Sequence, residues 1–257
     1  MKELYERFNF PKSSFTIDVI SEDCVVIRNA LSVEDCNKFI EIGKREKKKK
    51  GGTAHNQPLP KDFRNSDIAW IFPANMSETS KILLKWVGFV NEMMGWGAVF
   101  SKHMPHQNAQ YTEYSTDGLY SWHRDINHEE KHPYETRMIS TTVLLNNSDE
   151  FEGGEFQIET DCSFKLNPGN PGSEELAKLV FSHGGNKGLN KDVPKKYKTV
   201  VMKNKGDMVI FKSYQRHRVK KVTGGIRNSL VAWFNDGVLL NKMKSKRTKP
   251  IITRRGL

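Results

Sequence analysis

Hydrophobic residues follow two different periods along this chain, and the first of them is helical. Between residues 82 and 93 the apolar positions recur every three or four residues: Ile82, Leu83, Trp86, Phe89, Val90 and Met93. That spacing is typical of one face of a helix. Ser77 or Thr79 can cap its start, and Gly95 and Gly97 are suited to its end. The pattern predicts a helix that packs its apolar face against a core.

An earlier stretch predicts strands followed by another helix. Residues 18–28 are rich in valine and isoleucine, which favours one or two short strands. Ser32 is a good N-cap, and Glu34 and Asp35 place negative charge in the first turn of the helix that follows. We expect this helix to fray in the lysine run that precedes Gly51.

After about residue 107 the pattern changes to short runs of β-branched and aromatic residues separated by Gly, Asn, Asp or Pro. These runs are Ala109–Tyr114, Met138–Leu145, Glu155–Glu159, Thr199–Lys203, Asp207–Phe211, His217–Val222 and Ser229–Asn235. Seven such strands predict a sandwich or jelly roll. The fold class is therefore mainly β with flanking helices.

We expect a single domain spanning residues 1–257, and the position of the strand runs divides it into three parts. Residues 1–106 are expected to support a jelly-roll catalytic core at 107–240, and 241–257 form a basic tail. A long polar stretch, Thr160–Lys198, interrupts the core and contains a segment, 173–181, that favours a short helix. A connection of that length inside a β domain is often a functional lid.

The net charge of +11 is concentrated in two segments. Residues 44–50 carry six basic residues and one acidic residue, and 241–257 carry seven basic residues and no acidic one. The remainder of the chain is nearly balanced. Such runs are usually solvated loops or tails, although they could also contact an anion such as nucleic acid.

Three further features of the sequence restrict the class of protein. No apolar run approaches the roughly 18 residues of a membrane span, and the N-terminus lacks the apolar segment of a secretion signal. The cysteines, Cys24, Cys36 and Cys162, are odd in number and far apart. Free thiols in a reducing compartment fit this usage better than disulfides, so we expect a cytoplasmic protein without membrane association.

The sequence His123-Arg124-Asp125 is the first candidate for chemistry. In an extended segment residues i and i+2 point to the same face, so the imidazole and the carboxylate converge. One more histidine would complete a 2-His-1-carboxylate site for a first-row divalent metal. Taken alone the motif is a weak signal, and a salt bridge near a turn is its more common explanation.

His217 is the natural third ligand because it follows the expected strand Asp207–Phe211. The other histidines lie in polar, loop-like stretches, and His106 and His128 are the alternatives. Arg227 lies in or beside an expected inner strand, where a charge needs an anionic partner. An arginine fork matches a carboxylate in two places. That carboxylate could belong to a ligand or to an acidic residue of the protein.

Four motifs in order resemble those of prolyl 4-hydroxylase-like oxygenases. Residues 114–125, YSTDGLYSWHRD, are similar to that family's motif, in which a Tyr and a Gly precede Tyr-x-x-His-x-Asp. The segments 140–146 with 152–155, 206–211, and 217–233 resemble its further motifs. An arginine ten residues after the second histidine is similar to the bacterial and phage hydroxylases; animal collagen hydroxylases carry lysine there.

The resemblance implies a double-stranded β-helix and an iron(II)- and 2-oxoglutarate-dependent dioxygenase that uses O2. It implies that His123, Asp125 and His217 bind iron and that the far carboxylate of 2-oxoglutarate binds Arg227. The further site residues that it implies are Tyr114 as a co-substrate contact, Tyr120 near the metal and Ser140 as a weaker co-substrate contact. The implied reaction hydroxylates an unactivated C–H bond, with succinate as the co-product.

Three functions remain open from the sequence. The leading one is hydroxylation of a prolyl or other residue in a peptide or protein substrate. An alternative enzyme acts on nucleic acid, which the basic segments could contact, although no row of aromatic residues interleaves with them. The third is a jelly-roll binding module that has lost its metal, and the retention of all four site residues argues against it. The oligomeric state is not predicted.

Overall fold

The structure is a computed structural model of the 257-residue chain. It describes residues 2–10, 15–52, 59–71, 77–100, 108–125, 137–161 and 193–235, without the side chains of 2 and 77–80. The expected helix at 173–181, most of the expected lid, Cys162, His106, His128 and the basic tail lie outside the described residues.

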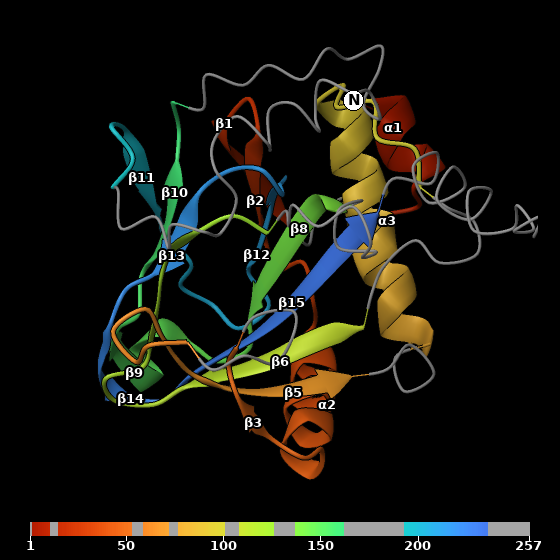
Figure 1. Ribbon diagram of the computed structural model, residues 1–257. Coiled ribbons are helices and arrows are strands. Elements are labelled where there is room, and N and C mark those ends of the chain that lie inside the picture. The colour runs from red at the N-terminus through yellow and green to blue at the C-terminus, as the bar shows by residue number, and fades with distance from the viewer. Residues whose placement is uncertain are drawn as a thin grey trace, which may run out of the picture.

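The described residues form two large antiparallel sheets and one small one (Figure 1). The larger sheet has the order β1 (Thr16–Ser21), β2 (Cys24–Arg28), β12 (Met208–Lys212), β8 (Arg137–Leu144), β15 (Arg227–Asn235), β6 (Ala109–Tyr114), β5 (Asp67–Ile71), β3 (Lys49–Lys50). The second has the order β11 (Tyr197–Val200), β10 (Phe156–Glu159), β13 (His217–Val219), β7 (Leu119–His123), β4 (Arg64–Asn65). The short strands β14 (Val222–Gly225) and β9 (Phe151–Gly153) form the third sheet, beside the 3₁₀ turn η3 (Ser148–Glu150). The expected mainly β, jelly-roll fold is confirmed.

Three helices are α1 (Lys2–Arg7), α2 (Val33–Arg45) and α3 (Ser77–Met93). Together with the large sheet they enclose one hydrophobic cluster, while a second cluster fills the space between the two large sheets. Strand β2 serves both, because Val25 and Ile27 face the helices while Cys24 and Val26 face the second sheet. Successive side chains of a strand point to opposite faces, which explains why β2 reads as an unbroken apolar run.

The predicted helix boundaries agree with the structure where its side chains are described. The Oγ of Ser32 accepts a hydrogen bond from the backbone N–H of Asp35 at 3.0 Å, so this residue caps α2 as predicted. Helix α2 ends at Arg45, at the edge of the lysine run. It lies close to β6, because a Cβ atom on Gly43 would stand 2.3 Å from the Tyr111 ring. Only glycine allows this approach.

The N-terminal part of the chain contributes more to the sheets than its pattern indicates. Strands β1, β2, β5 and β3 belong to the same sheet as the strands of the expected core. Strands β3, β4 and β7 and helix α1 were not predicted, since they are too short to show a clear period. The run 217–222, predicted as one strand, is divided between β13 and β14.

No helix among the described residues is long and apolar enough to cross a membrane. The two described cysteines, Cys24 and Cys36, are buried free thiols. Burial raises the pKa of Cys36 to about 12 and raises that of Cys24 further. Both thiols are therefore protonated and unreactive at neutral pH.

Candidate metal centre

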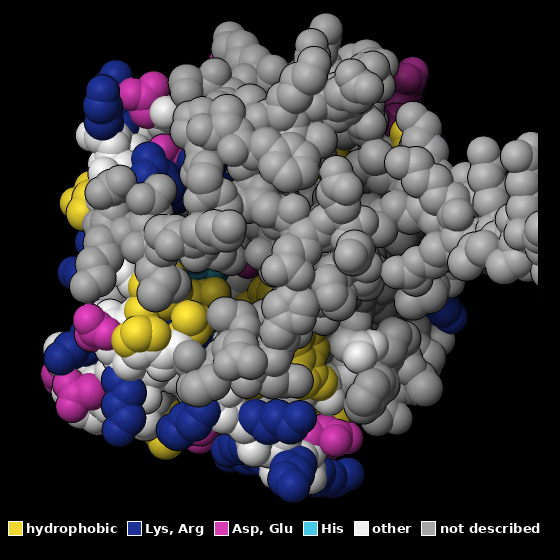
Figure 2. All heavy atoms as spheres, in the orientation of Figure 1, with side chains coloured by type: hydrophobic (Ala, Val, Ile, Leu, Met, Phe, Trp, Pro, Cys, Tyr) yellow, Lys and Arg dark blue, Asp and Glu magenta, His cyan; other side chains and the backbone are white. Residues whose placement is uncertain are grey.

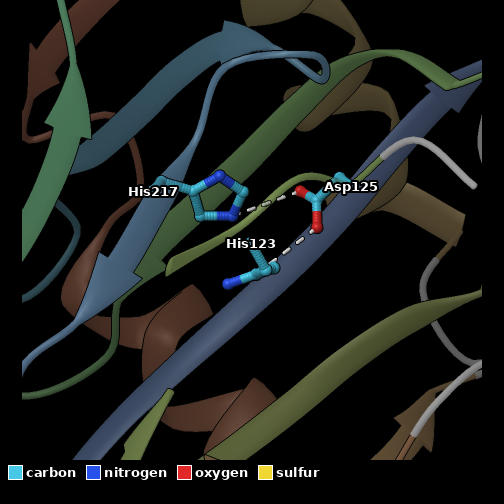
Figure 3. A group of neighbouring side chains, drawn as sticks. All are labelled: His123, Asp125 and His217. Carbon is cyan, nitrogen blue, oxygen red and sulfur yellow. Dashed lines mark ion pairs between the residues drawn. The ribbon is translucent and has the colours of Figure 1, made fainter. Parts of the chain in front are cut away.

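The sheet register brings the two proposed histidine ligands together. His123 is the last residue of β7 and His217 is the first residue of β13, and the two are direct partners in the antiparallel pair. Partners in a strand pair project their side chains to the same face. Asp125 follows two residues after His123, and its backbone N–H donates to the carbonyl of Ser213 at 3.1 Å. The three side chains converge (Figure 3), with one ligand atom from each lying within 4.8 Å of the others.

Each imidazole is held by a hydrogen bond to a backbone carbonyl two residues earlier. The Nδ1 of His123 lies 2.8 Å from the oxygen of Ser121, and the Nδ1 of His217 lies 3.0 Å from that of Gln215. With Nδ1 as the donor, the Nε2 atom of each ring presents a lone pair. These Nε2 atoms lie 3.8 and 3.6 Å from the two carboxylate oxygens of Asp125. All three donors face one small volume, as a metal ion requires.

The protonation states also suit a metal. Burial is the main reason that the pKa of His123 lies well below its ordinary value, so the ring is neutral. Burial alone would raise the pKa of Asp125, but His217, His123, Arg137 and Ser140 together hold it below its ordinary value. The Oδ2 atom of Asp125 is buried and accepts no hydrogen bond from a described residue. The neutral imidazole of His123, the Nε2 atom of His217 and the ionised carboxylate of Asp125 match the donor set of a 2-His-1-carboxylate iron site.

Arg227 forms a second site that lacks hydrogen-bond partners among the described residues. Its side chain is 1% exposed, and neither Nη1 nor Nη2 has a hydrogen-bond partner among the described residues. It opens β15 opposite Tyr114, whose ring centre lies 5.7 Å from the guanidinium carbon. A Cβ on Gly154, which has a φ of +66°, would stand 2.9 Å from the Cδ of Arg227. The glycine therefore makes room for a cation whose two outer nitrogens are free to bind an anion.

The two expected tyrosines come from neighbouring parts of the chain, Tyr114 at the end of β6 and Tyr120 in β7. Burial raises the pKa of Tyr114 and of Tyr120, so both hydroxyl groups stay protonated and able to donate. The ring of Tyr120 stacks on His123, with 3.4 Å between ring centres. It thereby fixes the plane of a proposed ligand ring.

Ser140 occupies a different part of the site. It is fully buried in β8, its Oγ lies 2.8 Å from the Oγ of Ser213, and its hydroxyl helps to keep Asp125 ionised. These contacts make Ser140 a support for the proposed metal ligand. Its predicted contact with the co-substrate stays a prediction.

Two further arginines near the site were not found from the sequence. Arg64, in β4, is 8% exposed, donates to Gln110, Ser66 and Gly52, and lies 4.2 Å from the Tyr120 ring centre. Arg137 opens β8, donates to the backbone oxygen of Asp125 at 3.1 Å and lies 3.9 Å from the ring centre of Trp233. Each stands at the edge of a strand in a polar run, where nothing in the local pattern indicates burial.

The family model that matches this chain covers the same β core. Residues 109–235 match the model of the 2OG-Fe(II) oxygenase superfamily. No curated protein sequence matches the chain significantly. The matched residues include every strand that carries a member of the triad and Arg227.

Three solved structures share the fold at low sequence identity. A prolyl-4-hydroxylase from Pseudomonas putida has a TM-score of 0.52 and 15% identity, covering 91% of this chain and 98% of its own. A prolyl hydroxylase from Trichoplax adhaerens, in complex with a peptide fragment of hypoxia inducible factor, has a TM-score of 0.58 and 14% identity, covering 96% of both chains. The non-heme alpha-ketoglutarate-dependent epimerase SnoN from nogalamycin biosynthesis has a TM-score of 0.56 and 12% identity, covering 91% of this chain and 82% of its own.

Residues 109–235 therefore form a 2OG-Fe(II) oxygenase domain, and the chain is a dioxygenase that uses iron(II), 2-oxoglutarate and O2. The predicted family, enzyme class and cofactors are thus confirmed. Because the fold is shared by hydroxylases and an epimerase, it does not by itself define the substrate.

Proposed function

We propose that this 2OG-Fe(II) oxygenase hydroxylates an unactivated C–H bond of a prolyl or other residue in a peptide or protein. The observation that carries the oxygenase part is a set of buried polar atoms without a hydrogen bond from the described residues, the Oδ2 of Asp125 and the two outer nitrogens of Arg227. Buried polar atoms without hydrogen bonds are costly. A metal ion at the first and a dicarboxylate at the second would satisfy both at once.

In this proposal His123, Asp125 and His217 hold the iron, and Arg227 binds the far carboxylate of 2-oxoglutarate with Tyr114 beside it. When bound, iron with 2-oxoglutarate and O2 supplies the oxidation, in which 2-oxoglutarate loses CO2 to become succinate and one oxygen atom enters the substrate C–H bond. The burial of all three ligand side chains, each 7 or 8% exposed, excludes water from the reacting centre. The protein thus supplies orientation and a dry cavity.

A peptide or protein substrate is supported by two considerations. The Trichoplax neighbour was solved with a peptide fragment, and the chain has the same fold. Arg64 provides a buried cation near Tyr120 whose hydrogen bonds all go to neutral oxygens. A polar side chain at that position is suited to orient a substrate with carbonyl groups.

The nucleic-acid alternative finds little support in the described basic segment. In residues 44–50, Arg45 pairs with Glu41, Lys48 with Glu113 at 2.8 Å, and Lys50 with Asp67 at 2.9 Å. On the face in Figure 2 the described lysine and arginine side chains are interspersed with acidic ones. A cytoplasmic location stays part of the proposal and rests on the buried free thiols.

The test is a coupled assay. Purified protein with iron(II), ascorbate and 2-oxoglutarate is incubated with proline-containing peptides or, separately, with oligonucleotides. We expect peptides to increase succinate formation and to gain one oxygen atom, as measured by mass spectrometry. Stimulation and oxygen incorporation with oligonucleotides alone would replace the peptide proposal by the nucleic-acid one. Absence of iron-dependent succinate formation under all conditions would contradict the assignment of the site.

A further inference from the structure

Glu159 is a buried carboxylate that the proposed reaction does not use. It ends β10, and its side chain is only 5% exposed. Its Oε1 accepts from Nε and Nη2 of Arg216 at 3.2 and 2.7 Å, and its Oε2 accepts from the backbone N–H of the same residue at 3.3 Å. Arg216 directly precedes the proposed ligand His217, so this carboxylate binds the residue immediately before β13.

The same carboxylate also reaches the other half of the metal centre. The Nη1 of Arg124 lies 3.6 Å from Oε2 of Glu159 and also donates to the backbone oxygen of Tyr214. Arg124 stands between His123 and Asp125, and its side chain points away from theirs because the segment is extended. One buried acid is therefore shared by the arginine inside the His-x-Asp motif and the arginine before the second histidine.

Backbone contacts extend this connection. The backbone N–H of Glu159 donates to the carbonyl of Arg216 at 2.8 Å, and Nε2 of Gln215 donates to the carbonyl of Glu159 at 3.1 Å. The sheet by itself does not fix the distance between the two ligand segments firmly, because the register between β13 and β7 shifts between His217 and Val219. Glu159, Arg124 and Arg216 are here called the Glu159 clasp. The clasp joins the two ligand segments where the backbone pairing between them is irregular.

We propose that Glu159 is a positioning residue, which sets the separation of His217 from His123 and Asp125 through Arg216 and Arg124. The inference rests on the proposed role of these three residues as metal ligands. Groups that orient metal ligands from outside the coordination sphere change metal affinity roughly 10–100-fold. Loss of the clasp should weaken metal binding by about 10-fold.

The experiment measures Co²⁺ binding to metal-free protein by calorimetry and by the visible absorption of the bound ion. Glu159→Gln removes the negative charge of the clasp, and Arg124→Met removes one of its two arginines. The second variant separates positioning from plain electrostatics. Removing a positive charge near the metal should strengthen cation binding if only charge matters, whereas lost positioning weakens it. Arg28→Met is the matched control, because Arg28 is likewise a partly exposed arginine on a buried carboxylate, Asp207, outside the metal centre.

We expect both clasp variants to bind Co²⁺ about 10-fold more weakly, with altered absorption bands, while Arg28→Met lowers the melting temperature and leaves both unchanged. Arg124→Met also keeps the test valid if Glu159→Gln does not fold, since this arginine is partly exposed. Wild-type affinity and spectrum in a folded clasp variant, or equal weakening in Arg28→Met, would overturn the proposal. Failure of the wild-type protein to bind Co²⁺ would instead contradict the metal centre itself.

Discussion

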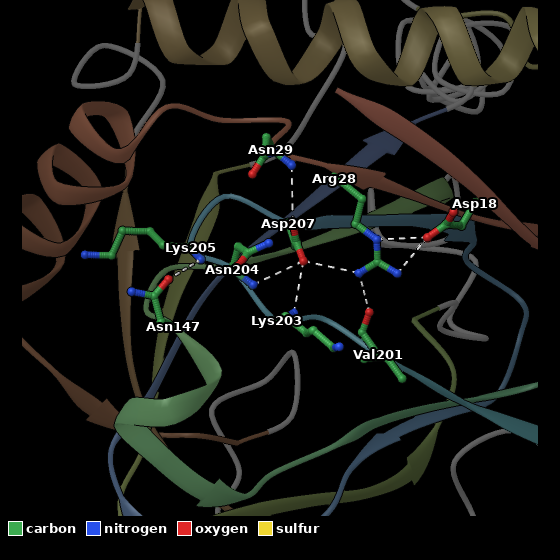
Figure 4. A network of polar contacts seen from close by, with 9 residues as sticks. All are labelled: Asp18, Arg28, Asn29, Asn147, Val201, Lys203, Asn204, Lys205 and Asp207. Carbon is green, nitrogen blue, oxygen red and sulfur yellow. Dashed lines mark hydrogen bonds and ion pairs between the residues drawn. The ribbon is translucent and has the colours of Figure 1, made fainter. Parts of the chain in front are cut away.

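Asp207 and Asp125 are both buried aspartates of the same jelly roll, but their surroundings differ in kind. Asp207 is fully buried before β12, and its Oδ2 accepts from the backbone N–H of Lys203 and of Asn204 at 3.0 and 3.2 Å (Figure 4). The same atom pairs with Arg28 at 3.2 Å, and Oδ1 accepts from the backbone N–H of Asn29 at 3.2 Å. Both oxygens of Asp207 are thus satisfied by the protein.

Asp125 shows the opposite arrangement. Its buried Oδ2 atom accepts no hydrogen bond from the described residues, and the two outer guanidinium nitrogens of Arg227 likewise have no partner among them. Buried polar groups in folded proteins are nearly always hydrogen-bonded, so each exception needs an explanation. The fold thus satisfies the buried charge of Asp207, whereas Asp125 and Arg227 keep buried polar atoms without described partners, as expected of the groups that we propose to bind a ligand.

The largest expected effect comes from removing a proposed ligand. His123→Ala, Asp125→Ala and His217→Ala should each abolish iron-dependent succinate formation, because a facial site cannot lose one of its three protein ligands. The measurement is succinate production, with circular dichroism to establish that each variant is folded. Full turnover by His217→Ala would mean that another histidine completes the site.

Substitution of the two aspartates should affect stability to different extents in the metal-free protein. Asp207→Asn should lower the free energy of unfolding by about 3–5 kcal/mol, since it breaks a buried pair and faces an amide toward donors. Asp125→Asn should lower it less, because the Oδ2 atom of Asp125 has no hydrogen bond from a described residue to lose. Urea titrations of both variants in a metal chelator provide the measurement. Equal destabilisation would remove the distinction between the two clusters.

Substitution of Arg227 tests whether its guanidinium group binds 2-oxoglutarate. Arg227→Ala should weaken 2-oxoglutarate binding by roughly 2–5 kcal/mol, which is tens to thousands of fold, because a desolvated charge pair loses one side. Arg227→Lys should have a milder effect, since it keeps the charge without the fork. Anaerobic titrations of iron-loaded proteins give the three affinities. An unchanged affinity in the alanine variant would require a different anion partner for this arginine.

The smallest effect is expected from the basic tail, which lies outside the described residues. Deleting residues 241–257 should leave succinate formation without substrate unchanged, since charge outside the cavity is screened over roughly 8 Å at physiological salt. The rate of the deletion variant is compared with that of the full chain. A loss of nucleic-acid binding together with substrate turnover would favour the nucleic-acid alternative.

Much of the core could be read from the sequence because its strands and helices have strong local patterns. The strand at Ala109–Tyr114 and the cap at Ser32 depend on alternation and on one side-chain hydrogen bond, both local properties. The short strands β3 and β4 could not be predicted, since two residues carry no period. Their pairing with β5 and β7 comes from contacts with distant segments.

The sequence by itself determined the identity of the proposed ligands and the class of chemistry, because His-x-Asp, the later histidine and the arginine form an ordered set of residue types. Only the tertiary structure decided that His123 and His217 are strand partners, that no acid among the described residues binds the outer nitrogens of Arg227, and that Glu159 joins Arg124 to Arg216. These are relations between segments far apart in the chain. Burial and pairing of charges depend on which strands the sheet brings together, and no local pattern encodes that.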